Sequence, residues 1–281
     1  MNRQIPFPPA GADWLESLRN VGKTEGTLDC YARDLRDVAE ASGASEAEQL
    51  PSVGQTAVDL IAVAWRSAGV GEATIVRRFS ALRGFAVYLV RERGMDLSSL
   101  LSADFPTAPK RRRQSVGADE IGRLLGDDPE GWRHVRDSAL FAVQSDAGLT
   151  SAETVGLDLE NVDLKNCLIR VVNTHLEPRI AGISERAQSL LQEYIRALPF
   201  DLAKADPLFV TSKRKRLDVR SAQVSFRRRR MRLGVSPRAT LMGLRHANAA
   251  RLVAQGNAPA VVANALGVLA TTVGRYFDGE G

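Results

Sequence analysis

Two stretches near the end of the sequence hold side chains that could carry out chemistry. LMGLRHANAARL, residues 241–252, places Arg245 and His246 at the start of an apolar helical pattern, and TTVGRYF, residues 271–277, contains Tyr276. A guanidinium presents a fixed fork of donors to a phosphate, an imidazole can transfer a proton, and a phenol can act as a nucleophile. These residue types therefore fit phosphoryl transfer.

Basic residues gather in several short runs, and such runs produce a local field that attracts phosphate groups. The chain has 38 Lys and Arg residues against 33 Asp and Glu residues, a formal net charge of +5 and a pI near 9.5. A solvated charged face explains any single run, but several together favour a nucleic-acid partner. The candidate DNA-binding residues are Arg77, Arg78, Arg83, Lys110, Arg111, Arg112, Arg113, Lys213, Arg214, Lys215, Arg227, Arg228, Arg230 and Arg245.

Composition argues against several other classes of protein. No apolar stretch approaches the roughly 20 residues that span a bilayer, and the N-terminus lacks the apolar core of a signal peptide, so we expect a cytoplasmic, nucleoid-associated protein. The cysteines, Cys30 and Cys167, are far apart in the sequence and in no metal-ligand spacing. They predict neither a disulfide framework nor a zinc site, and we expect no metal.

Helices are the elements expected to position the candidate side chains. Helical patterns dominate the first part of the sequence. Apolar residues recur at helical spacing in 14–21, in 27–42, near 55–68 and in 71–94, with Thr27 suited to cap the second helix. In the last segment, the apolar stripe that we expect to face the core is Ile75, Phe79, Leu82, Phe85, Ala86 and Leu89. Arg77, Arg78 and Arg83 lie largely off this stripe and are expected to face a partner.

A stretch with prolines, charge and no periodicity, SADFPTAPKRRRQSVGADE, predicts a domain boundary at about residue 108. We therefore expect a helical domain over 1–108 and a second domain over 109–281. In the second part, the expected elements are helices in ADEIGRLLG and VRDSALFAVQSDAG, a small sheet or hairpin within 158–184, a helix at 185–197, a short strand at 207–210, a basic helix around 219–233 and three helices in 241–276, broken at Gly256-Asn257 and Gly267.

The order of these segments resembles the tyrosine recombinase, or phage integrase, family over nearly the whole chain. TLDCYARDL and TIVRRFSALRGFAVYLVRE resemble the family's N-terminal core-binding helices, which hold one side of the DNA. The stretch that carries the family's first catalytic arginine resembles DAGLTSAETVGLDLENVDL, and the stretch that carries the second resembles LRHANAARLVAQGNAPAVVANALGV. The segment with the family's nucleophile resembles TTVGRYF. The resemblance implies a mainly α fold with a small antiparallel β-sheet, in which a helical core-binding domain and a mixed α/β catalytic-like domain form a two-domain clamp.

In this family, a tyrosine attacks a DNA phosphodiester, and two arginines neutralise the charge that builds on the phosphate oxygens. A lysine on a β-hairpin protonates the leaving 5′ oxygen, and histidines assist proton transfer and phosphate binding. The resemblance implies these roles for the matching positions. It implies no metal or organic cofactor, because the phosphotyrosine stores the energy of the broken bond.

Several matching positions carry other residue types. The first arginine is replaced by Thr150, the hairpin lysine by Thr174 and the two histidines by Met242 and Val268. The family's acidic neighbour is kept as Glu153, and the basic-acidic-basic pattern after the lysine becomes Glu177-Pro178-Arg179. Arg245, His246 and Tyr276 are retained, although the run that leads to Tyr276 is one residue shorter than the family usually shows.

These replacements predict that catalysis has been lost. The basic residues nearest to Thr150 in the sequence, Arg136 and Lys165, are more than ten positions away, so neither is expected to replace the missing guanidinium. His175, beside Thr174, could serve as an acid. Apolar side chains at positions 242 and 268 suggest a pocket that has closed into packing. We therefore predict a homologue that is not an enzyme, in which Arg245, His246 and Tyr276 are vestigial.

The expected function is DNA binding by a recombinase-like protein, in a regulatory, antagonistic or structural role in recombination or transcription. Two alternatives stay open: an active site-specific recombinase with a divergent site that uses Tyr276, and a protein-protein interaction module that no longer binds DNA. The expected partners are double-stranded DNA and another tyrosine recombinase, and not a membrane. Only FDGEG follows Tyr276, so we expect a monomer in free solution that associates, at most, on DNA.

Overall fold

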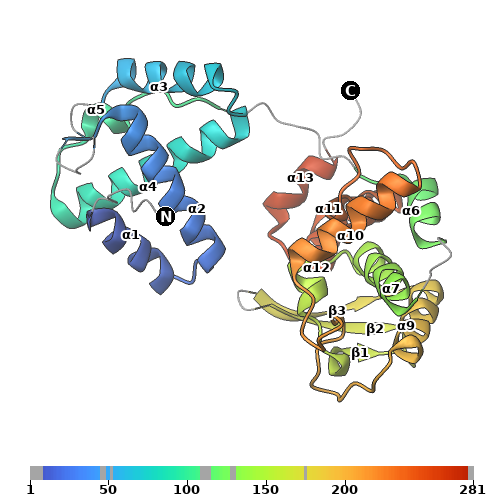
Figure 1. The fold of residues 1–281 in the computed structure, drawn as a ribbon. Helices are drawn as coiled ribbons and strands as arrows, with labels where there is room; N and C mark the ends of the chain where they lie inside the picture. Colours follow the sequence, from blue (N-terminus) through green and yellow to red (C-terminus); the bar gives the residue numbers. More distant parts are fainter. Residues whose placement is uncertain are drawn as a thin grey trace. The chain divides into compact units, whose positions relative to one another are not determined.

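The computed structural model describes residues 9–44, 49–50, 53–107, 115–126, 131–173 and 176–277 (Figure 1). The chain separates into two compact units, Met1–Arg111 and Arg112–Gly281. The domain boundary expected at about residue 108 falls within 108–114, outside the described residues, and stays a prediction. Within the described ranges, no helix is both long and apolar enough to cross a membrane.

The N-terminal unit is built from helices. They are α1 (Pro9–Asn20), α2 (Glu25–Ser42), α3 (Gln55–Ser67), α4 (Glu72–Arg93) and the short α5 (Ser98–Leu101). The helices expected from apolar periodicity are confirmed, with one correction at the start of α2. Thr24, not Thr27, caps this helix, because its backbone is extended and its hydroxyl accepts a hydrogen bond from the Thr27 amide at 3.3 Å. Thr27 already lies in the first turn, where its amide needs the cap.

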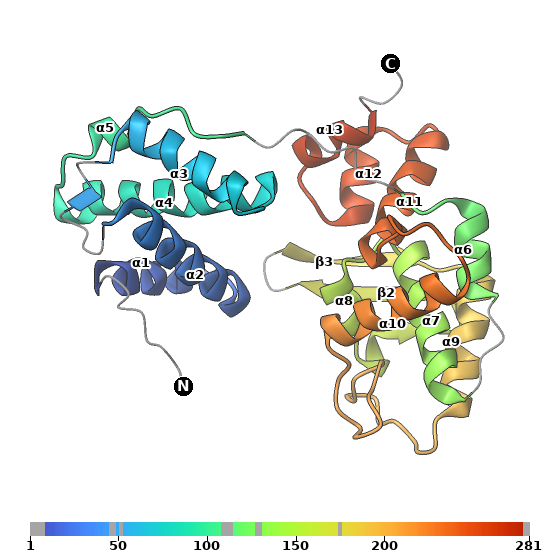
Figure 2. The same cartoon turned by 45° about the horizontal axis from the view of Figure 1, so that its top comes forward.

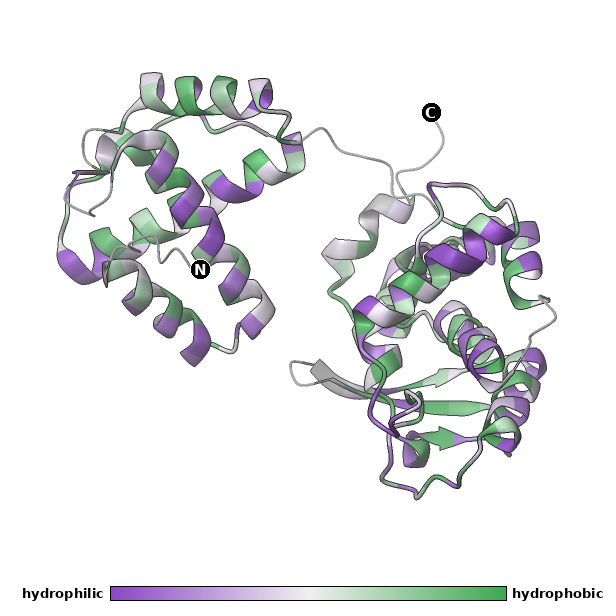
Figure 3. Ribbon diagram, viewed as in Figure 1, coloured by the Kyte–Doolittle hydropathy of each residue, from purple (hydrophilic) through white to green (hydrophobic). Residues whose placement is uncertain are grey.

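Apolar side chains of α4 form the centre of this unit. All six members of the expected stripe, from Ile75 to Leu89, are buried. The ring of Trp65 on α3 lies 5.2 Å from that of Phe79, and the ring of Trp14 on α1 lies 5.7 Å from that of Phe85. Figure 3 shows how hydrophobic and hydrophilic residues alternate around these helices. The stripe is therefore the surface on which α1 and α3 meet α4.

The C-terminal unit combines a small sheet with helices. Its elements are α6 (Ala118–Leu125), α7 (Trp132–Asp146), α8 (Ser151–Gly156), a 3-10 turn (Leu159–Asn161), β1 (Val162–Asp163), β2 (Leu168–Asn173), β3 (Leu176–Gly182), α9 (Glu185–Ala197), α10 (Val219–Arg232), α11 (Leu241–Ala254), α12 (Pro259–Leu266) and α13 (Ala270–Phe277). The three strands run antiparallel in the order β1-β2-β3, with Arg170 opposite Ile180. α7 is buried along most of its length and packs on α9 and α11 (Figure 2). The expected fold class, mainly α with a small antiparallel sheet, is confirmed.

Residues 207–210 form an irregular segment rather than the expected strand, with isolated bridges at the two ends. Tyr194 on α9 satisfies part of their backbone, since its hydroxyl donates to the Leu208 carbonyl at 3.0 Å and accepts from the Val210 amide at 3.2 Å. The segment is buried except at its first residue. Its apolar character therefore reflects packing in the core and not pairing in the sheet.

The last three helices share a small apolar cluster. Its buried members are Ala249, Val262, Ala263, Leu266 and Val273. The helices end at the two breaks that the sequence predicts, where Gly256 and Gly267 have φ angles of +77° and +61°. Glycine adopts this left-handed conformation without steric cost. The cluster packs α13, which carries Tyr276, onto α11, which carries Arg245 and His246.

Candidate active site

Arg245 is fixed by two backbone segments that are distant in the sequence. Its Nη1 donates to the Gly148 carbonyl at 2.6 Å, and its Nη2 donates to the Leu266 carbonyl at 2.7 Å. Nη1 also lies 3.4 Å from Glu153 Oε2. The side chain is only 7% exposed. Its guanidinium is thus held in one orientation before any ligand arrives, as a site for developing negative charge requires.

Thr150 has a structural role that accounts for its residue type. It is the N-cap of α8: its hydroxyl accepts from the Glu153 amide at 3.1 Å, while Glu153 Oε2 accepts from the Thr150 amide at 2.7 Å. This reciprocal pair is a capping box. The cap fixes the carboxylate of Glu153 at the start of the helix but brings no positive charge to the position of the family's first arginine.

Arg179 on β3 reaches the same carboxylate from the sheet. Its Nη1 donates to Glu153 Oε1 at 2.6 Å and its Nε to the Ala265 carbonyl at 3.3 Å. Burial alone would raise the pKa of Glu153, but hydrogen bonds from Arg179 and Thr150, with the charge of Arg179, hold that pKa below its ordinary value. Reasoning from sequence neighbours missed this guanidinium because Arg179 is 26 residues from Glu153 and only the fold brings them together.

Tyr276 contacts the residue that follows Arg245. Its hydroxyl lies 2.7 Å from Nδ1 of His246, and the two rings are 5.9 Å apart between centroids. His246 is 8% exposed. The run before Tyr276 is one residue shorter than the family usually shows, and the Tyr276 hydroxyl still reaches His246.

The remaining positions that carry non-family residues are placed in different ways. Met242 on α11 and Val268, just after α12, are half-buried, so neither is fully enclosed as the expectation of a closed pocket requires. Val268 packs against the apolar cluster of the last three helices. Thr174 and His175 lie outside the described residues.

Two of the expected DNA-binding residues on α4 are engaged within the N-terminal unit, contrary to the expectation that they face a partner. Arg77 forms an ion pair with Asp34, which is 1% exposed. Arg78 pairs with Asp37 at 2.6 Å, and its guanidinium lies 4.7 Å from the centroid of the Trp65 ring. These contacts hold α2, α3 and α4 together, and a role of either arginine on DNA stays a prediction.

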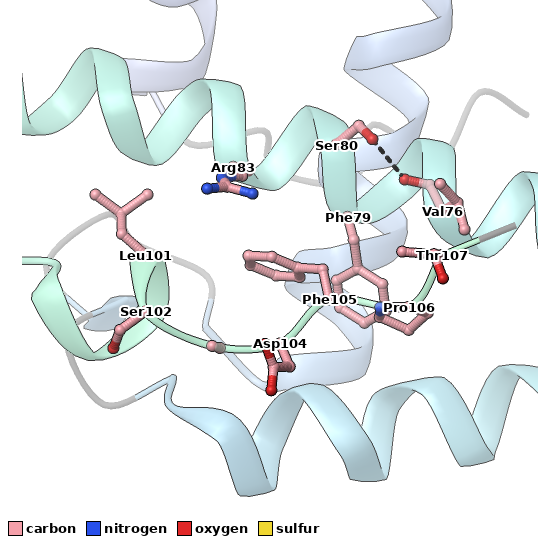
Figure 4. Close-up of a pocket in the computed structure, with 11 residues that line it drawn as sticks. Val76, Phe79, Ser80, Arg83, Leu101, Ser102, Asp104, Phe105, Pro106 and Thr107 are labelled. Carbon is pink, nitrogen blue, oxygen red and sulfur yellow. Dashed lines mark hydrogen bonds between the residues drawn. The ribbon is translucent and has the colours of Figure 1, made fainter.

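Arg83 is exposed on the same helix. It lines an open cavity of about 660 Å³ within the N-terminal unit, where Figure 4 shows it above the ring of Phe105. Its guanidinium carbon lies 5.9 Å from the centroid of that ring. A cation over an aromatic face is held by the ring's quadrupole while its charge stays accessible to solvent.

Basic residues of the C-terminal unit divide between surface and interior. Among the candidate DNA-binding residues of this unit, those that are exposed are Lys213, Arg214, Lys215, Arg227 and Arg228. Arg230 donates to the Ala239 carbonyl, and Arg229 is buried, where it donates to Ser138 and to two backbone carbonyls. Lys110, Arg111, Arg112 and Arg113 lie outside the described residues.

Known proteins resemble this chain over most of its length. A model of the phage integrase family matches residues 114–278, and a model of the phage integrase N-terminal SAM-like domain matches residues 12–93. A tyrosine recombinase XerC of Methylobacterium sp. (strain 4-46) is 31% identical over 265 residues, which are 90% of this chain and 83% of that protein. A tyrosine recombinase XerC of Escherichia coli O139:H28 is 27% identical and spans 81% of this chain and 76% of that protein.

Solved structures share the fold at low sequence identity. A Tn1549 transposon integrase in complex with transposon right end DNA has a TM-score of 0.74 at 16% identity, covering 97% of this chain and 95% of that one. A XerH site-specific recombinase bound to a palindromic difH substrate also has a TM-score of 0.74, at 19% identity, covering 93% and 78%.

The comparisons correct one prediction from the sequence. The expectation that the chain is not an enzyme is wrong, because relatives at 27–31% identity over most of its length are named as tyrosine recombinases, which are enzymes. Replacement of individual side chains at family positions was too narrow a basis for that prediction.

Proposed function

Because this chain belongs to the phage integrase family, we propose that it is a tyrosine recombinase that cleaves and rejoins duplex DNA through Tyr276. The observation that carries the proposal is the 2.7 Å contact between the Tyr276 hydroxyl and Nδ1 of His246, the residue that follows Arg245 on α11. Nucleophile, proton acceptor and phosphate ligand thus come from α13 and the first turns of α11. Relatives named as tyrosine recombinases support the same reaction class.

The reaction exchanges one phosphodiester bond for another. The phenolic oxygen of Tyr276 attacks the phosphorus, a new P–O bond forms, and the bond to the 5′ oxygen breaks. His246, in the tautomer with an unprotonated Nδ1, takes the phenol proton, and the leaving oxygen takes a proton from solvent water to become a 5′-hydroxyl. Attack by a 5′-hydroxyl on the phosphotyrosine reverses these steps and releases the tyrosine.

Arg245 suits the role of phosphate ligand because its orientation is set in advance. A guanidinium has five N–H donors in a rigid plane, and contacts to Gly148 and Leu266 hold that plane in place. A positive charge at 7% exposure is weakly screened by water, so it acts strongly on charge that develops in the transition state.

Duplex DNA is the proposed substrate. Exposed basic side chains of the 213–215 loop and of α10 provide charge that can neutralise backbone phosphates. The similar Tn1549 integrase and XerH structures are complexes with DNA, which supports the same class of ligand here.

The test uses a pool of duplexes with randomised sequence and a nick in one strand. Cleavage near the nick releases a short fragment, so rejoining fails and the phosphotyrosine accumulates. Wild-type protein should give a protein-DNA band that survives denaturing electrophoresis, and Tyr276→Phe should give none while still shifting DNA in a native gel. Sequencing of the trapped DNA would identify the cleavage position.

Two results would contradict the proposal. One is a wild-type protein that binds the pool without forming the denaturant-resistant band. The other is a band that persists in Tyr276→Phe, which would assign the nucleophile to a different residue.

A further inference from the structure

The geometry points to Arg179 as the residue that supplies the second phosphate-binding guanidinium, which Thr150 does not provide. This inference rests on the proposed strand-cleaving function. It assigns to a strand residue the charge that the family places at the start of α8.

One carboxylate joins the two guanidinium groups. Glu153 Oε1 accepts from Arg179 Nη1 at 2.6 Å, and Glu153 Oε2 lies 3.4 Å from Arg245 Nη1. The Thr150 amide donates to the same Oε2 at 2.7 Å. Arg179 therefore binds directly to Glu153, which forms the capping box with Thr150, the position of the family's first arginine. The same carboxylate also contacts Arg245.

Two guanidinium groups share one carboxylate in this group. Arg179 and Arg245 contribute two positive charges, and Glu153, whose pKa is lowered, contributes one negative charge. The three side chains are 7–8% exposed, so water screens them weakly. Glu153 pairs with both guanidinium groups, and a phosphodiester would bring a further negative charge to Arg179.

Within the part of the chain that the structure describes, one donor group of Arg179 has no acceptor. Its Nη2 is buried and has no hydrogen-bond partner among the described residues. Leaving such a donor unsatisfied costs about 1–3 kcal/mol. Nε and Nη1 are already held by Ala265 and Glu153, so the orientation of Nη2 is set in advance. A phosphate oxygen is an acceptor that would satisfy it.

Gly267, the C-cap residue of α12, leaves room for the Arg179 side chain. A Cβ built on Gly267 would lie 2.5 Å from Arg179 Nη1 and 2.8 Å from Cζ, so the guanidinium occupies the space above a bare glycine. Position 267 directly precedes Val268, which stands where the family has a histidine. The guanidinium of Arg179 thus lies near Thr150 and Val268, the two positions at which the family has an arginine and a histidine.

The experiment compares four proteins on the trapped nicked substrate: wild type, Arg179→Ala, Arg179→Lys and, as matched control, Arg170→Ala, which removes an exposed arginine from the neighbouring strand. In Arg179→Ala, Glu153 keeps its contacts with Arg245 and the Thr150 amide, so folding should be preserved. We expect the adduct to form about 100- to 1000-fold more slowly in Arg179→Ala, with Arg179→Lys between and Arg170→Ala unchanged.

A change in the substrate separates charge neutralisation from a structural role. A methylphosphonate at the cleavage position carries no negative charge, so a residue that neutralises the phosphate is no longer needed there. Most of the difference between wild type and Arg179→Ala should disappear on this substrate. The inference is overturned if Arg179→Ala matches wild type on phosphate DNA, or if its defect is equally large on the methylphosphonate.

Binding of inorganic phosphate tests Arg179 even if no adduct forms. At matched ionic strength, phosphate should raise the melting temperature of wild type more than that of Arg179→Ala. Equal shifts in the two proteins would overturn the inference. Absence of adduct in wild type together with a smaller phosphate shift in Arg179→Ala would refute the proposed strand cleavage and leave the phosphate site standing.

Discussion

Arg77 and Arg229 bind acceptors within their own units, and the carboxyl or carbonyl groups that they bind are buried or backbone groups. Arg77 pairs with buried Asp34, and Arg229 binds Ser138 together with the carbonyls of Leu124 and His134. Such contacts satisfy charge that would otherwise be costly to bury. A basic run in the sequence therefore does not place every member on the surface, since Arg229, in the last turn of α10, is 4% exposed.

Removal of Arg77 should destabilise the protein in a pH-dependent way. Burial raises the pKa of Asp34, and Arg77 offsets only part of this effect. The folded carboxyl thus holds its proton to higher pH than the unfolded one, and stability falls as the pH rises through the interval between the two pKa values. Arg77→Ala raises the pKa of Asp34 further, so we expect a loss of about 1–3 kcal/mol at pH 7 and a smaller loss near pH 4.

Urea unfolding of wild type and variant at both pH values measures this difference. Arg91→Ala is a suitable control, because Arg91 lies on the same helix with its side chain 73% exposed. Equal losses at the two pH values would show that the ionised carboxyl of Asp34 is not what Arg77 stabilises.

The ends of helices α11 and α12 help to position the candidate site. A glycine follows each end, so substitutions at the two glycines can be compared directly. Gly256 and Gly267 both have positive φ, but a Cβ on Gly256 would meet no atom within 4 Å, whereas one on Gly267 would meet Arg179. Gly256→Ala and Gly267→Ala should each lose about 1–2 kcal/mol from backbone strain. Only Gly267→Ala should also displace Arg179 and slow adduct formation on the nicked substrate. The same adduct rate in both variants would argue against this arrangement.

Tyr194 joins α9 to the irregular segment at 207–210. Its buried hydroxyl satisfies the Leu208 carbonyl and the Val210 amide, and burial raises its pKa to about 12. Tyr194→Phe should lower the free energy of unfolding by about 1–3 kcal/mol, because both backbone groups lose their partner. The phenol stays protonated at neutral pH, so the loss should be the same at pH 6 and pH 8 in chemical denaturation. No loss would mean that the segment finds other partners.

For the whole molecule, DNA binding should depend steeply on salt. Basic residues are exposed in both units, among them Arg83, Lys213 and Arg228, so several phosphates can be neutralised together. We expect a slope on the order of −4 or steeper in a plot of log affinity against log salt concentration. Replacing Lys213, Arg214 and Lys215 by Ala should reduce the slope by about one for each phosphate contact that is lost.

Fluorescence anisotropy with a labelled duplex at several salt concentrations measures this slope. Glu160→Gln removes one exposed acidic charge and should not weaken binding. A slope near zero for the wild type would contradict duplex binding through the basic surface.

Local patterns in the sequence were sufficient for the helices, for the buried stripe of α4 and for the segment order that indicates the family. They also identified Arg245, His246 and Tyr276, because these stand in recognisable helical contexts. Periodicity reports which face of an element is buried, and the breaks at Gly256 and Gly267 follow from the properties of glycine alone.

Only the tertiary structure decided which side chains meet. Arg179 reaches Glu153 because the antiparallel register of β2 and β3 and the packing of α12 place it there, and neither is encoded in the residues next to Thr150. For the same reason, the buried segment at 207–210 was mistaken for a strand, since an apolar run does not show whether its backbone pairs with a sheet or with a tyrosine hydroxyl. Burial is a local signal in the sequence, whereas the partner of a buried polar group depends on the path of the whole chain.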